Sequence, residues 1–169
     1  IKQLVSFSGG MDSATLLAWA KTRGDVVAVS FMYGSKHNSE ELEAGFVFCM
    51  RLGVNRTVVD LSSIFAMLRS DLLLSGGEIP TGHYAAENMK KTVVPGRNTI
   101  FNSVLMGLAE SHGFDRVLVG AHSGDHHIYP DCRPGYLSSM EQAFYHATEG
   151  KVTFESPFAT WDKAKILKL

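Results

Sequence analysis

Short apolar segments rich in β-branched residues alternate along the chain with longer segments of helical periodicity. The apolar segments are residues 4–7, 26–31, 57–61, 117–120 and 152–154. Apolar positions at helical spacing occupy residues 13–22, 39–52, 62–68, 99–112, 135–149 and 160–169. This alternation is typical of successive βαβ units. The sequence therefore predicts an α/β fold, with a doubly wound, mostly parallel five-stranded sheet and helices on both faces.

Residues at the ends of the first two predicted helices give further local predictions. Gly24 and Gly53 follow these helices, where a left-handed C-terminal residue is favoured. Asn38, with Glu41 three residues later, is typical of a capping box at the start of the second helix.

The segment from residue 70 to residue 94 shows no period. Regular structure is interrupted there by Gly76, Gly77, Pro80 and Gly82. We expect a long loop, and loops of this length are commonly functional.

Composition and charge narrow the class of protein. The chain has 169 residues, of which 45% are hydrophobic and 20% charged, as expected for one globular domain. Sixteen basic residues against seventeen acidic ones give a net charge of -1, which argues against nucleic acid as a partner. No apolar run approaches the roughly 20 residues of a membrane helix, and residues 1–15 lack a signal-peptide layout. We expect a soluble, cytoplasmic protein.

The most specific local signal is Ser8-Gly9-Gly10-Met11-Asp12-Ser13, which directly follows the first predicted strand and opens the first helix. Its glycines allow close approach of the backbone, and N–H groups at a helix start favour an anion such as pyrophosphate. Ser8 and Ser13 add hydroxyl donors. Asp12 would repel phosphates unless it holds a cation, so we expect it to bind Mg²⁺.

This hexapeptide resembles the SGGxDS motif of the PP-loop ATP pyrophosphatases, a family of adenylating enzymes. Four further stretches narrow the resemblance to the 7-cyano-7-deazaguanine (preQ0) synthases. They are residues 33–37 with Glu41 and Leu42, Val94-Pro95-Gly96-Arg97-Asn98, Tyr129-Pro130-Asp131-Cys132-Arg133-Pro134, and Ser156-Pro157-Phe158 before Lys163. The resemblance implies the use of ATP and Mg²⁺ to convert 7-carboxy-7-deazaguanine and ammonia to the nitrile, through adenylated intermediates and an amide.

The chain departs from that family in two respects. The family carries a four-cysteine zinc site, and the two cysteines of this chain, Cys49 and Cys132, cannot replace it. We therefore interpret residues 1–169 as a single PP-loop domain that lacks the C-terminal segment and its zinc ligands. Where the family has Asp-Tyr-Gly-Gln-Arg-His, this chain differs at Met32, Ser35 and Lys36. Roles that depend on the aspartate or arginine do not transfer.

The end of the second predicted strand is a candidate nucleotide site, because open α/β sheets bind ligands at the carboxyl ends of their strands. Backbone groups of Ser30, Phe31 and Met32 are candidates for contacts with the adenine of ATP. Tyr33 is a candidate for contact with the second substrate. His37 is assigned to the ATP site, where it either orients phosphate or substrate or is a solvated cap, and both interpretations stay open.

Arg97 and Lys163 are the candidate cations for the phosphates. Arg97 lies just before the helix predicted at residues 99–112, and its planar fork suits phosphate or carboxylate. Lys163 lies near the start of the last predicted helix. Together with Asp12 these residues form the predicted catalytic set, in which the two cations neutralise developing charge.

A polar loop follows the fourth predicted strand, and Gly120 at its start is assigned to the ATP site. The residues assigned to the second substrate are Tyr33, Asp125, Tyr129, Asp131, Cys132 and Arg133. In the family interpretation, Asp131 and Arg133 divide the recognition of a guanine-like edge and of the substrate carboxylate. Cys132 is either a nucleophile or a lining residue, and we favour lining. His126 and His127 do not have the spacing of a metal motif.

We therefore expect an ATP-dependent C–N ligase of queuosine or related deazapurine biosynthesis. Its partners would be the small molecules ATP, 7-carboxy-7-deazaguanine and ammonia, with no nucleic acid and no membrane, and a homodimer stays open. Two alternatives remain: another PP-loop synthetase or a relative that transfers the deazapurine, and a nucleotide-binding module that has lost catalysis.

Overall fold

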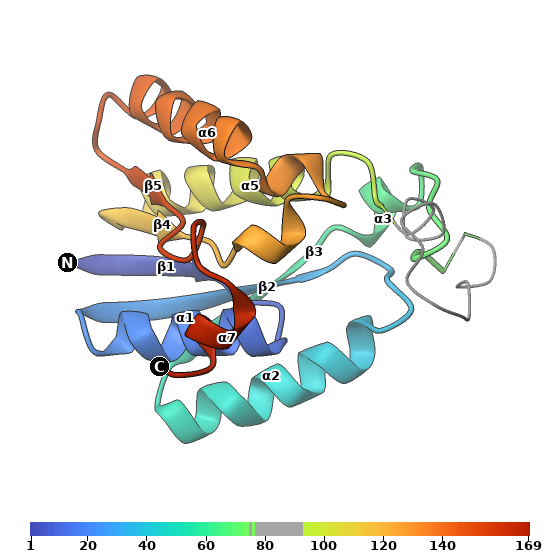
Figure 1. Ribbon diagram of the computed structural model, residues 1–169, viewed down its shortest axis with the longest axis horizontal. Coiled ribbons are helices and arrows are strands. Elements are labelled where there is room, and N and C mark those ends of the chain that lie inside the picture. Colours follow the sequence, from blue (N-terminus) through green and yellow to red (C-terminus); the bar gives the residue numbers. More distant parts are fainter. Residues whose placement is uncertain (75, 77–92) are drawn as a thin grey trace.

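The computed structural model describes residues 1–74, 76 and 93–169. Five strands form one all-parallel sheet in the order β3-β2-β1-β4-β5 (Figure 1). They are β1 (Lys2–Ser6), β2 (Asp25–Met32), β3 (Asn55–Asp60), β4 (Arg116–Leu118) and β5 (Thr153–Glu155). The chain builds outward from β1 to β3 and then returns to the other side of β1. This reversal confirms the doubly wound prediction.

The helices lie on both faces of the sheet. They are α1 (Met11–Lys21), α2 (Asn38–Leu52), α3 (Ser62–Phe65), α5 (Arg97–His112), α6 (Pro134–Ala147) and α7 (Lys163–Ile166). Figure 1 shows α1, α2 and α7 below the sheet and α5 and α6 above it. Within the described residues, no helix has the length and apolar character needed to cross a bilayer.

Two apolar cores separate along the central strand because successive side chains of a strand point to opposite faces. Leu4 packs with Leu105 of α5, whereas Val5 packs with Leu16 of α1. Val5 is fully buried and lies in register with Leu118 of β4. Burial on both faces explains why the inner strands β2, β1 and β4 appear in the sequence as apolar runs, whereas β3 at the edge of the sheet has no buried residue.

The two predicted helix-terminating glycines behave differently. Gly53 ends α2 in the left-handed conformation with φ 63°, as predicted. The prediction for Gly24 is wrong, because α1 ends at Lys21 and its cap, Thr22, is right-handed. The Thr22 hydroxyl donates to the backbone carbonyl of Trp19 at 2.8 Å.

The predicted capping box at Asn38 is also wrong. His37 is the N-cap of α2, and Asn38 is the buried first residue of the helix. The Asn38 side chain accepts the backbone N–H of Tyr33 at 2.7 Å and donates to the carbonyl of Phe31 at 3.0 Å. It therefore fixes the turn that leaves β2 instead of capping the helix that follows.

The predicted loop at residues 70–94 is described in part, and the predicted helix at residues 160–169 is described in full. Residues 72–74 pair with residues 34–36, with the Leu74 N–H donating to the Gly34 carbonyl at 2.8 Å. Gly77, Pro80 and Gly82 lie outside the described residues. The last helix is shorter than predicted and starts at Lys163, because the Asp162 carboxylate caps it by accepting the Lys165 N–H at 2.7 Å.

Candidate functional site

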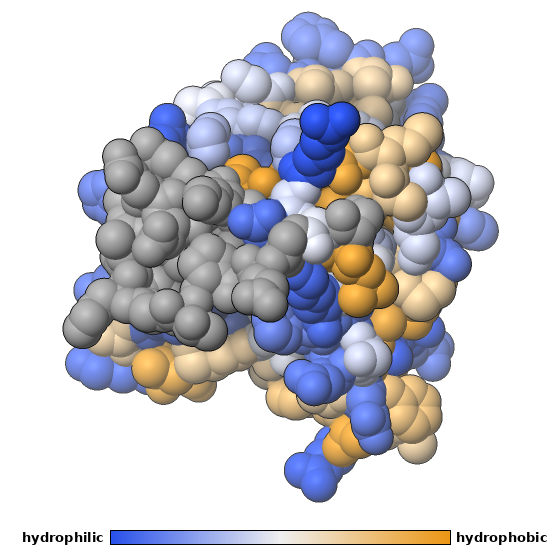
Figure 2. All heavy atoms as spheres, turned by 90° about the vertical axis from the view of Figure 1, so that its right-hand side faces the viewer, coloured by the Kyte–Doolittle hydropathy of each residue, from blue (hydrophilic) through white to orange (hydrophobic). Residues whose placement is uncertain are grey.

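A pocket of about 330 Å³ lies where the carboxyl ends of β1, β2 and β4 meet the first turns of α1 and α5. This edge of the sheet faces the viewer in Figure 2, where hydrophilic and hydrophobic side chains are mixed. Its volume is within the range of small-ligand sites, and it occupies the crevice where the strand order reverses. Eleven predicted site residues line it: Ser8, Asp12, Ser13, Ser30, Phe31, Tyr33, Arg97, Gly120, Asp125, Asp131 and Cys132.

The turn from β1 into α1 forms one wall of the pocket. The Ser13 hydroxyl donates to the Gly10 carbonyl at 2.9 Å and lies 3.1 Å from the Ser8 hydroxyl. Gly10 is the N-cap of α1 and supplies no side chain to its first N–H groups. These N–H groups, with the positive end of the helix dipole, form an environment that favours an anion.

Gly9 is required by the backbone of this turn. Its φ of 90° is a conformation that residues with a side chain rarely adopt. A Cβ atom at this position would also collide with the backbone carbonyl of Glu41 at the start of α2. The close contact between the turn and α2 therefore depends on glycine.

Asp12 and Asp125 converge on one buried imidazole. His122 follows β4, and its Nε2 lies 3.4 Å from Asp12 Oδ2 and 3.6 Å from Asp125 Oδ2. Its Nδ1 accepts the backbone N–H of Gly124 at 3.0 Å, so the neutral ring carries its proton on Nε2. Asp12 Oδ2 also lies 3.9 Å from Nζ of Lys163. Asp12 Oδ1 is buried and has no hydrogen-bond partner in the described part of the chain.

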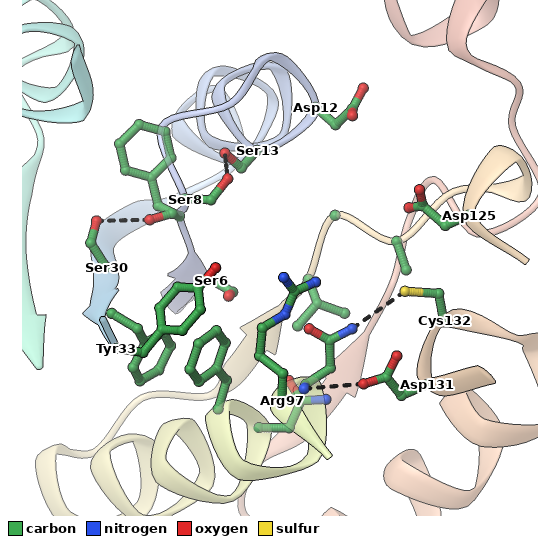
Figure 3. Close-up of a pocket in the computed structure, with 18 of the residues that line it drawn as sticks. Ser6, Ser8, Asp12, Ser13, Ser30, Tyr33, Arg97, Asp125, Asp131 and Cys132 are labelled. Atoms are coloured by element: carbon green, nitrogen blue, oxygen red, sulfur yellow. Dashed lines mark hydrogen bonds between the residues drawn. The ribbon is translucent and has the colours of Figure 1, made fainter. Parts of the chain in front are cut away.

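Arg97 extends from the first turn of α5 into the pocket (Figure 3). Burial acts to lower the pKa of its guanidinium, but Tyr33, Tyr129 and Asp131 outweigh that effect, so the pKa is raised and the group stays cationic. Among the residues that the structure describes, no carboxylate oxygen lies within 4.0 Å of the guanidinium. A half-buried cation that has no carboxylate within ion-pair distance favours binding of an anion.

Asn98 joins the start of α5 to the polar loop. Its backbone N–H donates to Asp131 Oδ2 at 3.2 Å, and its side-chain amide donates to the Cys132 sulfur at 3.3 Å (Figure 3). Burial, with the nearby carboxylates of Asp125 and Asp131, raises the pKa of the Cys132 thiol to about 12. The thiol is therefore neutral near pH 7.

An aromatic cluster borders the pocket beneath these polar groups. The rings of Phe31 and Phe101 stack with centroids 4.1 Å apart, and Tyr33 meets Phe101 edge-on at 5.3 Å. Glu41 also lines the pocket, and desolvation raises the pKa of its carboxyl despite His37 and Arg97, which act to lower it. The pocket therefore combines a flat apolar surface with both hydrogen-bond donors and acceptors.

Seven predicted site residues do not line the pocket: Gly9, Gly10, Met32, His37, Tyr129, Arg133 and Lys163. Arg133 is exposed, and its Nε donates to the His126 carbonyl at 2.8 Å. Met32 and His37 are exposed too. Tyr129 contacts the Arg97 guanidinium, which lies 5.8 Å from its ring centroid.

Several lining residues were not predicted from the sequence, among them Ser6, Asn98, Phe101 and Asn102. Asn98, Phe101 and Asn102 share one face of α5 through their spacing of three and four residues. That spacing was a usable signal once the helix start was placed beside the site. His122 was also unassigned, because a histidine in a loop has no period that marks it.

Comparison with known proteins decides the family. The model of the family described as Queuosine biosynthesis protein QueC matches residues 2–169. The chain belongs to the QueC family. A 7-cyano-7-deazaguanine synthase of Porphyromonas gingivalis is 46% identical over 98% of this chain and 75% of its own length. One from Marinomonas sp. is 45% identical over 99% of this chain and 76% of its own length.

Solved structures agree on the fold of this QueC-family chain. A predicted subunit of tRNA methyltransferase from Methanocaldococcus jannaschii matches with a TM-score of 0.62 at 16% identity, over 99% of this chain and 73% of that one. An NH3-dependent NAD synthetase from Campylobacter jejuni matches with a TM-score of 0.58 at 16% identity, over 99% of this chain and 61% of that one. At this identity the likeness supports the α/β fold alone.

Proposed function

We propose that this QueC-family chain is an ATP-dependent ligase that converts 7-carboxy-7-deazaguanine and ammonia to 7-cyano-7-deazaguanine. The family membership and the names of its relatives support the reaction. The observation that carries the site assignment is Arg97, an enclosed guanidinium that shares one pocket with the glycine turn at the start of α1. This arrangement provides two separate anion-binding groups, as expected for a nucleotide and an acid that react with each other.

The glycine turn would hold the phosphates of ATP. Backbone N–H groups at the start of α1 and the hydroxyls of Ser8 and Ser13 would donate to the phosphate oxygens. Lys163, whose Nζ lies 3.9 Å from Asp12 Oδ2, would supply positive charge at the same end of the pocket.

The residues at Asp12 fit a magnesium ion. Mg²⁺ in nucleotide sites commonly takes one or two carboxylates together with phosphate oxygens. Asp12 Oδ1, which is buried without a donor in the described part of the chain, would gain a partner on binding it. Magnesium would supply charge neutralisation of the phosphates when bound.

Arg97 would hold the carboxylate of the acid or the departing pyrophosphate, and the stacked Phe31 and Phe101 rings would border a planar base. Asp131 would retain its bond to the Asn98 N–H, which leaves one carboxylate oxygen for the base. Cys132 would line the pocket as a neutral thiol, not as a nucleophile.

The proposed reaction has two adenylylation steps. A carboxylate oxygen of the acid attacks the α-phosphorus of ATP and releases pyrophosphate, and ammonia then displaces AMP to give the amide. The amide oxygen attacks a second ATP, again releasing pyrophosphate. Loss of both protons from the amide nitrogen and departure of AMP with the C–O bonding electrons leave the nitrile. The pocket's part is to align the acid with the α-phosphorus and to neutralise the charge that develops.

The test supplies purified protein with ATP, Mg²⁺, the carboxy-deazaguanine and ammonia, and follows AMP, pyrophosphate and nitrile. We expect two AMP for each nitrile, and loss of about 10²-fold or more in rate for Asp12→Asn if this carboxylate contributes charge stabilisation. AMP release with a different acid would contradict the proposal in favour of another synthetase. Tight ATP binding without any turnover would contradict it in favour of an inactive nucleotide-binding module.

A further inference from the structure

We propose that His122 is a positioning residue for Asp12, and this inference rests on the proposed function of Asp12 in binding Mg²⁺ with ATP. His122 is almost fully buried, at 6% exposed, and it connects the polar loop after β4 to the phosphate end of the pocket. Buried polar side chains without a partner are costly, so the partners of this imidazole define what it does.

One hydrogen bond fixes which nitrogen of the His122 ring faces Asp12. Nδ1 accepts the Gly124 N–H at 3.0 Å, so it is unprotonated. The ring proton of the neutral imidazole therefore lies on Nε2, which is 3.4 Å from Asp12 Oδ2 and 3.6 Å from Asp125 Oδ2. Gly124 is suited to this arrangement, because a Cβ atom there would lie 2.8 Å from His122 Cε1.

The two oxygens of Asp12 have different surroundings. Oδ2 faces His122 Nε2 and Lys163 Nζ, whereas Oδ1 is buried and has no hydrogen-bond partner within residues 1–74, 76 and 93–169. The contact of Oδ2 with Nε2 at 3.4 Å, together with Lys163 Nζ at 3.9 Å, favours the carboxylate rotamer that leaves Oδ1 as the oxygen with free lone pairs. Outer-shell groups that orient metal-binding carboxylates typically contribute 10- to 100-fold in metal affinity.

His122 also touches Asp125, so one imidazole spans the two walls of the pocket. A purely structural alternative exists, in which the histidine serves only to accept the Gly124 N–H and hold the turn at Ser123–Asp125. The positioning role uses Nε2 and the structural role uses Nδ1. Substitution by Asn or Gln distinguishes the two roles, because each amide side chain replaces only one of these nitrogens. Asn places its oxygen near the position of Nδ1, whereas Gln places its NH₂ near the position of Nε2.

The experiment measures binding of the non-hydrolysable analogue α,β-methylene-ATP by calorimetry as a function of Mg²⁺ concentration. The proteins are wild type, His122→Asn, His122→Gln and Asp12→Ala, and the unfolding temperature of each is recorded. The quantity compared is the Mg²⁺ concentration that gives half of the magnesium-dependent gain in affinity for the analogue. For His122→Asn we expect this concentration to rise about 10- to 100-fold, while for His122→Gln it stays within about threefold of wild type. Binding of the analogue without Mg²⁺ should change little in either variant.

The outcomes separate this inference from the function it rests on. If His122→Asn keeps the wild-type magnesium dependence, or if His122→Gln loses it as fully as His122→Asn does, His122 does not position Asp12. If only His122→Gln is impaired, the structural role at Gly124 is the correct one and the inference is overturned. If Asp12→Ala retains the wild-type magnesium dependence, the proposed role of Asp12 fails first.

Discussion

Arg97 and Arg133 offer a matched pair of guanidinium groups, one in the pocket and one exposed beside it. We expect Arg97→Met to lower kcat/KM for the acid by about 10²-fold or more, because it removes a desolvated cation from an anion site. Arg133→Met should stay within about threefold, as exposed charges contribute little. Steady-state kinetics with the acid as varied substrate measures both changes. A larger loss in Arg133→Met than in Arg97→Met would show that the loop rearranges to bring Arg133 to the substrate.

Cys132 gives a prediction of pH dependence. Its pKa is raised to about 12 by burial and by Asp125 and Asp131, so the thiol is neutral below that pH and becomes reactive only as the pH rises toward it. In a Cys49→Ala background, Cys132 is the one remaining cysteine of the full sequence. Its alkylation by iodoacetamide at pH 8 should be about 10²-fold slower or more than that of a cysteine peptide. Mass spectrometry measures the rate of alkylation. Rapid alkylation at pH 8 would instead indicate an activated thiolate.

At the scale of the element, the turn between β1 and α1 depends on one glycine. Gly9→Ala places a side chain at φ 90° and against the Glu41 carbonyl, so we expect it to lower the free energy of unfolding by about 2 kcal/mol or more. Gly107 is the control, since it lies exposed in α5 with open space around the position of a Cβ. Gly107→Ala should raise that free energy by about 0.5–1 kcal/mol. Urea denaturation of both variants decides the matter. Equal stability of Gly9→Ala and wild type would mean that the turn tolerates a side chain.

Helix ends show how far local sequence signals reach. Gly53 was predicted correctly because a left-handed residue after α2 depends on the glycine itself. The role of Asn38 was predicted incorrectly, because its side chain bonds to the backbone of Tyr33 and Phe31. The path of the turn after β2 determines these partners, and the capping pattern in the sequence does not. Capping residues compete for several backbone partners, so tertiary context decides among them.

At the scale of the whole molecule, the fold was predictable because the period of the hydrophobic pattern changes at almost every element. The strand order requires distant pairing, such as Val5 with Leu118, but right-handed βαβ connections leave few ways to build it. The candidate site was predictable where a motif marks the start of a helix, as at Ser8 before α1 and Arg97 in α5. His122 needed the structure, because its partner Asp12 lies more than a hundred residues away along the chain.

The absence of a close ion pair at Arg97 has a consequence for the stability of the protein. Among the described residues, Asp131 and Glu41 act on the guanidinium only from beyond 4.0 Å, so an anion bound between them would stabilise the folded state relative to the empty one. Inorganic pyrophosphate or the acid would then link the start of α1 to Arg97 of α5. Protein without these ligands would unfold locally more often and would be degraded faster by proteases. The concentration of these ligands would therefore affect the amount of folded protein as well as the rate of the reaction.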